Sequence, residues 1–553
     1  MKTKKLFFIA VMIIAAITFS SCKKSLQDII EETEKATFIV YTYDEYGSPM
    51  GSGSGFFIEK EGVGMTNFHV LDKSIKAIIK TTDEKQYEID SVLLASQKKD
   101  MLIFKIKNKD HVEFSTLDFA ADKPEKGDKV FVIGAPVGMA TSLSEGIVSA
   151  YRDDSHGEIV QTTAAISPGS SGSPILNDKG DVFAIASFKR KGGENVNFGV
   201  MLNKDFRSEL DEKEFYKKNR KFNSSKSDFV LLNILPDKGS DLTLNAIEFG
   251  PTATTLYLTY TNMHLGSGNW LVWCDLGNKD EGFFIEDKDT KKRYYATSSS
   301  IGTDKESGAS VGLGEVLQFK VNFPAIKTHL SNIDVMWGES DRDAHYSDID
   351  LEKYRENLSI DDLSYQRAYA LLYTTEGKNV AATMSILSDI LEENPSDVIS
   401  LNMMAILSYI IDNKTDAMIY LEDAIEENPN DELAYLNRAQ MYMWENRYDE
   451  AITDFTSAIN ISPLQPDYYY YRAISYNYTK QYQKSLDDLN KCIEVSNEED
   501  GYEDSPYLYE WRAHAYYNLN KINEARKDVQ KAFKLSKDSE LDERLQNFYN
   551  YCL

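Results

Sequence analysis

The sequence predicts a multi-domain chain with an all-β domain over residues 37–210, a β-rich, sandwich-like domain over residues 229–345 and an all-α array of helical repeats over residues 360–553. The length of 553 residues is too great for one hydrophobic core. The first two regions consist of short β-patterned segments separated by Gly, Pro and Asp turns, which is typical of barrels and sandwiches. The third region switches to helical periodicity and repeats itself.

An export signal is predicted at the start of the chain. A basic start is followed by an uncharged, apolar run from Leu6 to Phe19 and then by Ser20-Ser21-Cys22. This run is short for a membrane span and has the length of the core of a secretory signal. We therefore expect a signal peptide over residues 1–21 and a tether over residues 22–36.

Cys22 follows two small residues and resembles the cysteine of a bacterial lipoprotein lipobox, although Phe19 stands where that family usually has a smaller aliphatic residue. The resemblance implies cleavage before Cys22, acylation of its thiol and a chain that is secreted across the inner membrane and lipid-anchored in the cell envelope. Lys23 and Lys24 stand where surface-exported lipoproteins of some bacteria carry acidic runs, which favours the periplasmic face. An ordinary signal peptide and an uncleaved anchor are the alternatives.

Net charge and cysteine content exclude several kinds of partner and site. The formal net charge of −27 would repel a nucleic-acid backbone or an anionic lipid surface, so we expect no nucleic acid and a protein as main partner. Cys274, Cys492 and Cys552 are too scattered for a disulfide framework or a metal site. We expect isolated thiols and no metal.

The segment between the two β regions is predicted to be a linker over residues 211–228, because it is rich in Lys and Ser. The β-rich region that follows contains His264 and His329, which belong to no cluster with a recognisable ligand spacing. Lone histidines are more often structural than catalytic, and we interpret both as structural.

The helical region is built from an internal repeat. Pro395, Pro429 and Pro463 recur every 34 residues, with small residues aligned inside each period. This pattern resembles a tetratricopeptide array, in which small side chains let paired helices approach closely and the proline ends one repeat. A further repeat follows in an altered register, and a weaker first repeat begins near Leu371. The aligned small residues are Ala405, Ala439 and Ala473; Ala417, Ala451 and Ser485; and Ala424, Ala458 and Cys492.

Three short strings in the first β region carry groups suited to acyl transfer. Each alone is weak evidence, because packed histidines, turn aspartates and Gly/Ser loops are common in β proteins. Together they supply a serine oxygen, a base, a carboxylate to orient the base and loop N–H groups for an oxyanion. The strings are Thr66-Asn67-Phe68-His69-Val70, Lys99-Asp100-Met101-Leu102 and Gly169-Ser170-Ser171-Gly172-Ser173-Pro174.

With their flanking strings, these motifs resemble trypsin-like serine proteases of the HtrA type over about residues 37–203. That family is a double β-barrel with its active site in the cleft between the barrels. The resemblance implies that His69 is the general base, Asp100 orients it and Ser171 is the nucleophile. It also implies an oxyanion hole of the Gly169 and Ser171 N–H groups, polypeptide substrates, and no metal or organic cofactor. The flanking strings are Gly53-Ser54-Gly55-Phe56, Ile133-Gly134-Ala135-Pro136, Glu145 to Ala150 and Gln161 to Pro174.

The same resemblance predicts the residues that bind substrate. Ala165, six residues before Ser171, stands at the base of the specificity pocket and brings no carboxylate to pair with a basic side chain. The strand that matches the substrate-pairing edge of the family contains Asn197, Phe198 and Gly199.

Several features depart from the HtrA pattern. Ser170 stands where the family usually has Asn, and Ser173 where it often has Gly. Phe68 replaces a small residue beside the base and can narrow the cleft, so a latent site in the free enzyme is one possibility. The PDZ modules usual in this family are not legible downstream, so regulation by such modules is not expected.

The inward-facing positions of the repeats predict a partner-binding groove. They are uncharged and offer large apolar side chains, which suits a segment with hydrophobic anchors better than an acidic C-terminus. The alternative is that they pack against a neighbouring domain, such as the β region upstream. These residues are Gln440, Met443, Trp444, Ile474, Asn477 and Tyr478.

Taken together, these patterns predict an envelope serine endopeptidase that works through an acyl-enzyme, with helical repeats that recruit substrates or partners. The alternative is a catalytically silent scaffold that keeps the protease fold and acts through protein binding by the repeats.

Overall fold

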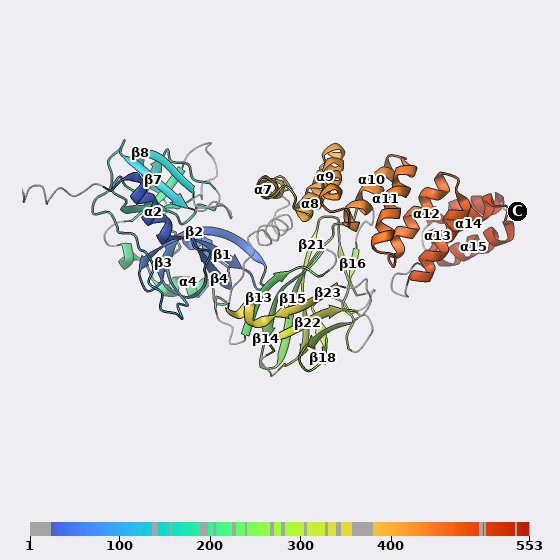
Figure 1. Cartoon of the computed structure of the whole chain (residues 1–553), viewed down its shortest axis with the longest axis horizontal. Coiled ribbons are helices and arrows are strands. Elements are labelled where there is room, and N and C mark those ends of the chain that lie inside the picture. Colours follow the sequence, from blue (N-terminus) through green and yellow to red (C-terminus); the bar gives the residue numbers. More distant parts are fainter. Residues whose placement is uncertain are drawn as a thin grey trace, which may run out of the picture. The chain divides into compact units, whose positions relative to one another are not determined.

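Figure 1 shows the fold of the chain, a computed structural model. The chain divides into two compact units. Unit 1 comprises Met1–Glu45, Pro49–Ser225 and Asn357–Ser359. Unit 2 comprises Tyr46–Ser48, Lys226–Glu356 and Ile360–Leu553. The structure describes residues 24–134, 142–154, 157–167, 169–187, 197–202, 206–223, 228–237, 241–265, 270–277, 282–303, 307–326, 330–338, 344–356, 380–496, 502, 505–536 and 539–551.

Unit 1 contains two closed, antiparallel β-barrels of six strands each, which confirms the predicted double barrel. The strand order is β1-β2-β3-β6-β5-β4 in the first and β10-β11-β12-β9-β8-β7 in the second. Each barrel fills its interior with β-branched and aromatic side chains, the residues that pack best on a pleated surface. The first barrel comprises β1 (Thr37–Tyr43), β2 (Pro49–Glu59), β3 (Val63–Thr66), β4 (Lys76–Thr81), β5 (Gln86–Ser96) and β6 (Met101–Ile106). The second comprises β7 (Lys129–Gly134), β8 (Ser142–Asp154), β9 (Gly157–Thr162), β10 (Pro174–Leu176), β11 (Val182–Ser187) and β12 (Asn197–Met201).

Two segments predicted as tether and linker are packed parts of unit 1. Helix α2 (Leu26–Ala36) begins at a capping box on Ser25 and buries Ile29 in a core cluster shared with strands of both barrels. After the short 3-10 helix η1 (Phe206–Glu209), helix α4 (Glu212–Lys218) buries Phe215 in the core of the first barrel. The linker prediction was wrong here because the dense charges of α4 lie outward, while a single aromatic side chain holds the helix in place.

The β-rich part of unit 2 consists of a five-stranded sheet, a four-stranded sheet and a two-stranded ribbon. One core cluster takes residues from both larger sheets, as in a sandwich. The five-stranded sheet contains β13 (Asp228–Ile234), β14 (Leu242–Phe249), β15 (Ala253–Thr261), β21 (Val316–Pro324) and β19 (Ser298–Ser299). The remaining elements are β18 (Lys292–Tyr295), β17 (Phe283–Asp287), β22 (Asn332–Trp337) and β23 (Ala344–Asp350) in the second sheet, β16 (Trp270–Val272) and β20 (Ala309–Val311) in the ribbon, and helix α5 (Leu351–Glu356).

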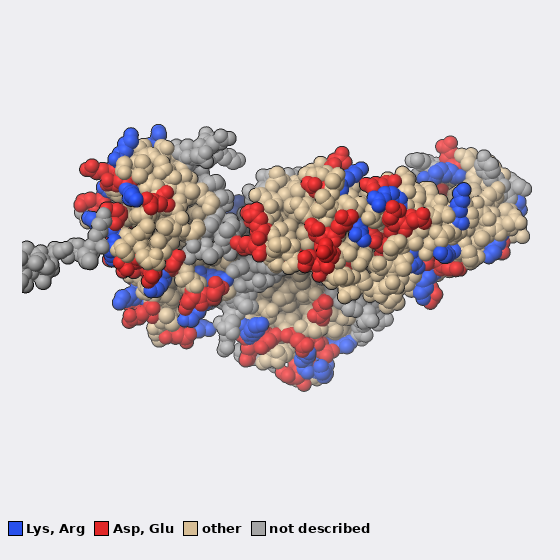
Figure 2. Space-filling model, turned by 45° about the horizontal axis from the view of Figure 1, so that its top comes forward, with Lys and Arg blue, Asp and Glu red and all other residues tan. Residues whose placement is uncertain are grey.

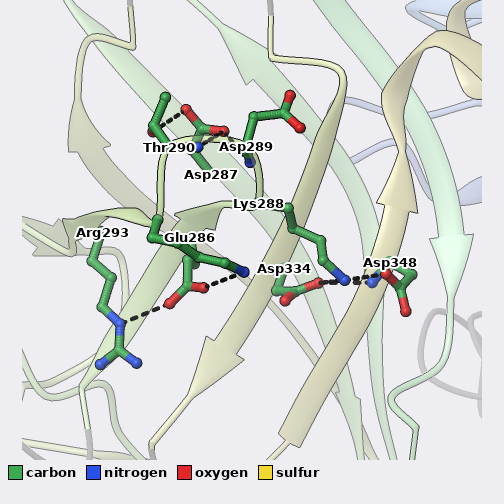
Figure 3. A network of polar contacts seen from close by, with 9 residues as sticks. Glu286, Asp287, Lys288, Asp289, Thr290, Arg293, Asp334 and Asp348 are labelled. Carbon is green, nitrogen blue, oxygen red and sulfur yellow. Dashed lines mark hydrogen bonds and ion pairs between the residues drawn. The ribbon is translucent and has the colours of Figure 1, made fainter.

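A polar network closes the β17–β18 hairpin (Figure 3). Asp287 accepts the backbone N–H of Asp289 at 3.0 Å and the Thr290 hydroxyl at 2.5 Å, which fixes the turn. Lys288 forms ion pairs with Asp334 and Asp348 on the neighbouring strands. The carboxylates of Asp287, Asp334 and Asp348 thus hold the hairpin and the neighbouring strands.

The C-terminal part of unit 2 is an array of paired helices, as the repeat predicted. Prolines at the starts of α12 and α14 occupy the first turn, where a missing N–H costs least. The helices are α7 (Val380–Glu393), α8 (Val398–Ile410), α9 (Lys414–Glu427), α10 (Glu432–Trp444), α11 (Tyr448–Ile461), α12 (Pro466–Tyr478), α13 (Tyr482–Val495), α14 (Pro506–Asn518), α15 (Ile522–Leu535) and α16 (Ser539–Tyr551).

A buried ion pair recurs in three successive repeats of the array. In each repeat an Arg on the first helix binds both carboxylate oxygens of an Asp sixteen residues later, at 2.7–2.9 Å. The fork geometry of the guanidinium matches the carboxylate, and both partners are largely buried. The pairs are Arg438–Asp454, Arg472–Asp488 and Arg512–Asp528.

Candidate active site

His69 and Asp100 form a hydrogen-bonded pair in the first barrel. His69 lies on the one-turn helix α3 (Phe68–Leu71) that follows β3, and Asp100 immediately precedes β6. Nδ1 of His69 lies 2.9 and 2.8 Å from the two carboxylate oxygens of Asp100, and the His69 backbone N–H donates to Oδ1 at 3.0 Å. Asn67 donates to the Asp100 carbonyl at 2.9 Å. These contacts fix the imidazole so that Nε2 is the nitrogen that can act as a base.

Ser187, at the end of β11 in the second barrel, donates to Oδ2 of Asp100 at 3.0 Å. It therefore helps to hold the carboxylate that orients His69. This role was not predicted, because a serine at the end of a strand has no distinguishing sequence pattern. The Asp100 side chain is only 3% exposed, so these hydrogen bonds replace the ones that the carboxylate would make with water in the unfolded chain.

Ser171 lies in a tight loop before β10. Gly172 has φ +94°, and a Cβ built on it would lie 1.9 Å from the Ser54 carbonyl oxygen, so this position requires glycine. Gly169 also has positive φ, at +87°. The loop thus takes a sharp turn that suits the predicted oxyanion hole, whose N–H groups must converge on one point.

The Ser171 loop and the helix that carries His69 meet at Gly53 of β2. A Cβ built on Gly53 would lie 2.8 Å from Val70, the neighbour of His69, and 3.1 Å from the Ser171 carbonyl oxygen. Within the described part of the chain no hydrogen bond joins His69 to Ser171. The base and the nucleophile are thus near each other without a hydrogen bond between them. This does not exclude a catalytic pair, because catalytic hydrogen bonds of free enzymes are often long and tighten only with substrate.

Phe68 lies in the core of the first barrel and does not narrow the cleft, as it was considered able to do. Its side chain is 2% exposed and lies in the core of the first barrel, with its ring centroid 5.8 Å from that of Phe215 on α4. The bulky residue beside the base therefore packs against α4, a helix that lies in the segment predicted to be a linker.

The segment before the Ser171 loop is held in place by two side chains. Ala165, which is exposed, donates its N–H to Oγ of Ser144 at 2.6 Å, and Ile166 donates to Oδ1 of Asn197 at 3.2 Å. Asn197 therefore supports the segment that contains Ala165.

The prediction that Asn197, Phe198 and Gly199 pair with substrate is wrong. Strand β12 is flanked by β9 and β11, so Phe198 is opposite both Gln161 and Ser187. A strand with partners on both sides has no free backbone edge for a peptide. Gly199 is required by packing instead, because a Cβ there would lie 2.3 Å from Ile175.

The protease motifs lie inside a region that matches a known family model. Residues 53–185, which include His69, Asp100 and Ser171, match the trypsin-like peptidase domain. This chain contains a trypsin-like peptidase domain. Residues 433–463 and 506–539 match the tetratricopeptide repeat, which confirms the nature of the helical array.

Two relatives illustrate the likeness. A probable periplasmic serine endoprotease, DegP-like, from Ectopseudomonas mendocina is 35% identical over 148 residues, which are 26% of this chain and 30% of the relative. The chloroplastic Protease Do-like 1 of Arabidopsis thaliana is 33% identical over 156 residues, which are 26% of this chain and 35% of the relative. The match thus spans about a third of the length of these proteins and is confined to the protease domain.

Cys22 and the predicted signal peptide lie outside the described residues. In the described ranges, none of the helices combines the length and the apolar character that a membrane crossing needs. Across the same residues no group of three or more His, Cys, Asp and Glu side chains is placed to hold a metal ion. Cys274 and Cys492 are buried free thiols, as predicted, whereas Cys552 is not among the residues described.

The β region of unit 2 packs against helices α7, α8, α9 and α10 of the array. Met263 and Leu265, from the loop after β15, are buried in the cores of these helices. The side-chain amide of Asn437 on α10 binds the backbone of this loop. Its oxygen accepts the Leu265 N–H at 2.9 Å, and its NH2 group donates to the Met263 carbonyl at 3.0 Å. The β region thus packs against the first repeats, but through residues other than the six predicted to line the groove.

Four of the six residues predicted to line the groove divide into two pairs. Gln440 and Ile474 are 2% and 7% exposed, so neither can contact a partner while the array is folded. Trp444 and Tyr478 are 43% and 52% exposed. Each exposed ring stacks on a tyrosine of its own unit, with ring centroids 5.0 Å apart for Trp444 with Tyr409 and 4.4 Å apart for Tyr478 with Tyr448.

His264, between Met263 and Leu265, is expected to make this packing sensitive to pH. Its Nε2 lies 3.0 Å from Oδ2 of Asp241. Burial alone would lower the pKa of His264, but its hydrogen bond to Asp241 and the nearby Asp467 and Glu432 raise that pKa above its ordinary value. The folded state thus binds the proton more tightly than the unfolded state does.

Unit 2 is therefore expected to be most stable below the ordinary histidine pKa of about 6.5 and to lose stability as pH rises through the raised pKa. Thermal unfolding at a series of pH values checks this, and His264→Gln should flatten the profile. His514→Gln is the matched control, because burial lowers the pKa of His514. Equal pH profiles for wild type and His264→Gln would contradict the expectation.

Proposed function

We propose that the chain is a serine endopeptidase of the cell envelope that cleaves polypeptides through an acyl-enzyme. The observation that carries the proposal is the junction at Gly53, where the Ser171 loop meets the helix that presents His69, itself paired with Asp100. The family match to residues 53–185 supports the same reaction class.

In the proposed reaction Oγ of Ser171 attacks the scissile carbonyl while Nε2 of His69 takes its proton. Asp100 keeps the imidazole in the required tautomer and stabilises the imidazolium, and Ser187 and Asn67 hold Asp100. His69 then gives the proton to the leaving amine, and water hydrolyses the acyl-enzyme by the same route. The N–H groups of Gly169 and Ser171 are the proposed donors to the oxyanion.

Labelling of the purified chain with a fluorophosphonate tests the proposal. We expect one adduct, on Ser171, because His69 is the proposed base for that serine. Labelling on Ser170 or Ser173 instead would contradict the assignment. A folded chain that is not labelled at all, and that cleaves no unfolded protein, would support the scaffold alternative.

Cleavage is expected after small or medium apolar residues. In trypsin-like folds the residue at the position of Ala165 lies at the base of the specificity pocket, and an alanine there has no carboxylate to pair with a lysine or arginine. A peptide library read by mass spectrometry measures this preference. Ala165→Asp, which adds the carboxylate, should shift cleavage toward basic residues. A wild-type profile dominated by lysine and arginine would overturn the expectation.

We also propose that Cys22 is acylated and anchors the mature chain on the periplasmic face of the envelope. The proposal rests on the lipobox-like sequence and on the periplasmic assignment in the name of one relative. Fractionation of cells that express Cys22→Ala tests it, because the variant should leave the membrane fraction. An unchanged distribution would exclude the anchor.

The helical array is proposed to recruit a polypeptide through its exposed aromatic rings, Trp444 and Tyr478. Large rings offer apolar contact area at a low entropy cost. Asp and Glu side chains gather over the array on the face shown in Figure 2, and α9 exposes Asp416, Glu422 and Asp423. A segment with hydrophobic anchors therefore fits the exposed rings best.

Trp444→Ala with Tyr478→Ala is expected to weaken capture of a protein partner by at least tenfold while hydrolysis of a short peptide stays unchanged, because hot-spot aromatics often contribute about 2 kcal/mol each. Pull-down from envelope extracts and a peptide assay measure the two effects. Ile419→Ala is the matched control, because Ile419 is exposed but lies on the second helix of its repeat, α9. Unchanged capture, or an unfolded array, would remove the proposed role.

A further inference from the structure

Ser54 of β2 makes three hydrogen bonds at the point where the first barrel contacts the Ser171 loop. Its backbone N–H donates to the Ser171 carbonyl at 2.7 Å, and its hydroxyl donates to the Gly169 carbonyl at 2.9 Å. Its own carbonyl accepts the hydroxyl of Thr66 at 2.7 Å. Because Thr66 ends the strand that leads into α3, Ser54 connects the base-bearing segment with the nucleophile loop.

The two carbonyls that Ser54 holds lie on either side of the peptide unit between Ser170 and Ser171. That unit carries the Ser171 N–H, one of the two proposed oxyanion donors. Peptide units are planar, so fixing the planes before and after it restricts the direction in which this N–H can point. The restriction matters because Gly169 can adopt several backbone conformations at little cost.

We infer that Ser54 is a positioning residue that pre-aligns the oxyanion hole through its hydroxyl. Ser54 is fully buried, so it acts through the loop and not on substrate. Oxyanion donors lower the barrier only when they are already oriented as charge develops. The inference rests on the proposed function, since an oxyanion hole has a purpose only if Ser171 is acylated.

Ser54→Ala removes the hydroxyl but keeps the backbone hydrogen bond to Ser171. Loss of one oxyanion donor costs about 10²–10³ in kcat, and a donor that is only misaligned should cost less, about 10-fold to 100-fold. KM should change by less than about threefold, because the lost interaction operates mainly in the transition state. Ser54→Thr keeps a hydroxyl at the same carbon and should restore most of the activity.

Ser173→Ala is the matched control. Ser173 is also fully buried and lies in the same loop, but its hydroxyl has no hydrogen-bond partner in the described part of the chain. Its removal should leave kcat unchanged. A purely structural role of Ser54 would lower the melting temperature of Ser54→Ala without changing the kcat of the folded enzyme.

The outcomes separate this inference from the proposed function. A wild-type chain that is neither labelled at Ser171 nor active overturns the proposed function, and the role of Ser54 with it. A wild-type chain that is labelled, together with Ser54→Ala that keeps kcat within about twofold, overturns the Ser54 inference alone. A kcat loss in Ser54→Ala that Ser54→Thr reverses and Ser173→Ala does not share supports it.

Discussion

Ser171→Ala and His69→Ala are each expected to lower kcat for peptide hydrolysis by about 10⁴-fold or more, because nucleophile and base act as one unit. The double variant should lose little more than either single one. Steady-state assays on an unfolded protein and on a short apolar peptide measure the loss. Circular dichroism should show an unchanged fold, since Ser171 and His69 lie in short segments between strands.

The control for this experiment is Ser170→Ala. Ser170 adjoins the proposed nucleophile, but among the described residues its hydroxyl contacts only that of Ser167, at 3.3 Å. It should keep most of the activity. Full activity in Ser171→Ala would mean that another group is the nucleophile.

Arg472→Ala is expected to destabilise the helical array by about 3–5 kcal/mol, because it leaves the carboxylate of Asp488 buried without its partner. Burial already raises the pKa of Asp488, and the Arg472 guanidinium is what opposes that rise. Urea unfolding followed by circular dichroism measures the change. Arg472→Leu combined with Asp488→Leu should be far less destabilising than Arg472→Ala alone, because no charge then stays buried.

Arg447→Ala provides the comparison for an exposed pair. Arg447 lies 3.1 Å from Glu450 on the surface, with both side chains nearly half exposed. Its removal should cost far less than the removal of Arg472, because an exposed ion pair contributes little to stability. Equal losses for Arg447→Ala and Arg472→Ala would show that the repeated pair contributes no more than a surface contact.

The parts of the fold that the sequence predicted best are those in which one packing solution is repeated. Pro395, Pro429 and Pro463 mark equivalent points because each repeat packs on the last in the same way. The three Arg–Asp pairs were not predicted, although their separation of sixteen residues is the same in each repeat, because charges on helices are usually solvated.

The site was predictable where chemistry requires particular residues in a fixed order. His69 and Asp100 are hydrogen-bonded as the resemblance implied. Ser187 and Ser54 were not predicted to have any role, because they act through hydrogen bonds across the two barrels, which a local pattern cannot show. The substrate-pairing strand was misplaced for a similar reason, since pairing on both sides of β12 depends on strand order.

The burial of Met263 and Leu265 among the helices of the array determines which fragments of the protein can be expressed separately. An array expressed from Val380 onward would leave Asn437 without its backbone partners and would expose the apolar residues that this loop covers. Such a fragment would bury the exposed apolar surface by self-association. Proteins recovered with it would include any chain that can cover this surface, whether or not that chain is a natural partner. A fragment that contains the array should therefore also contain the β region of unit 2, whose first strand is β13 (Asp228–Ile234).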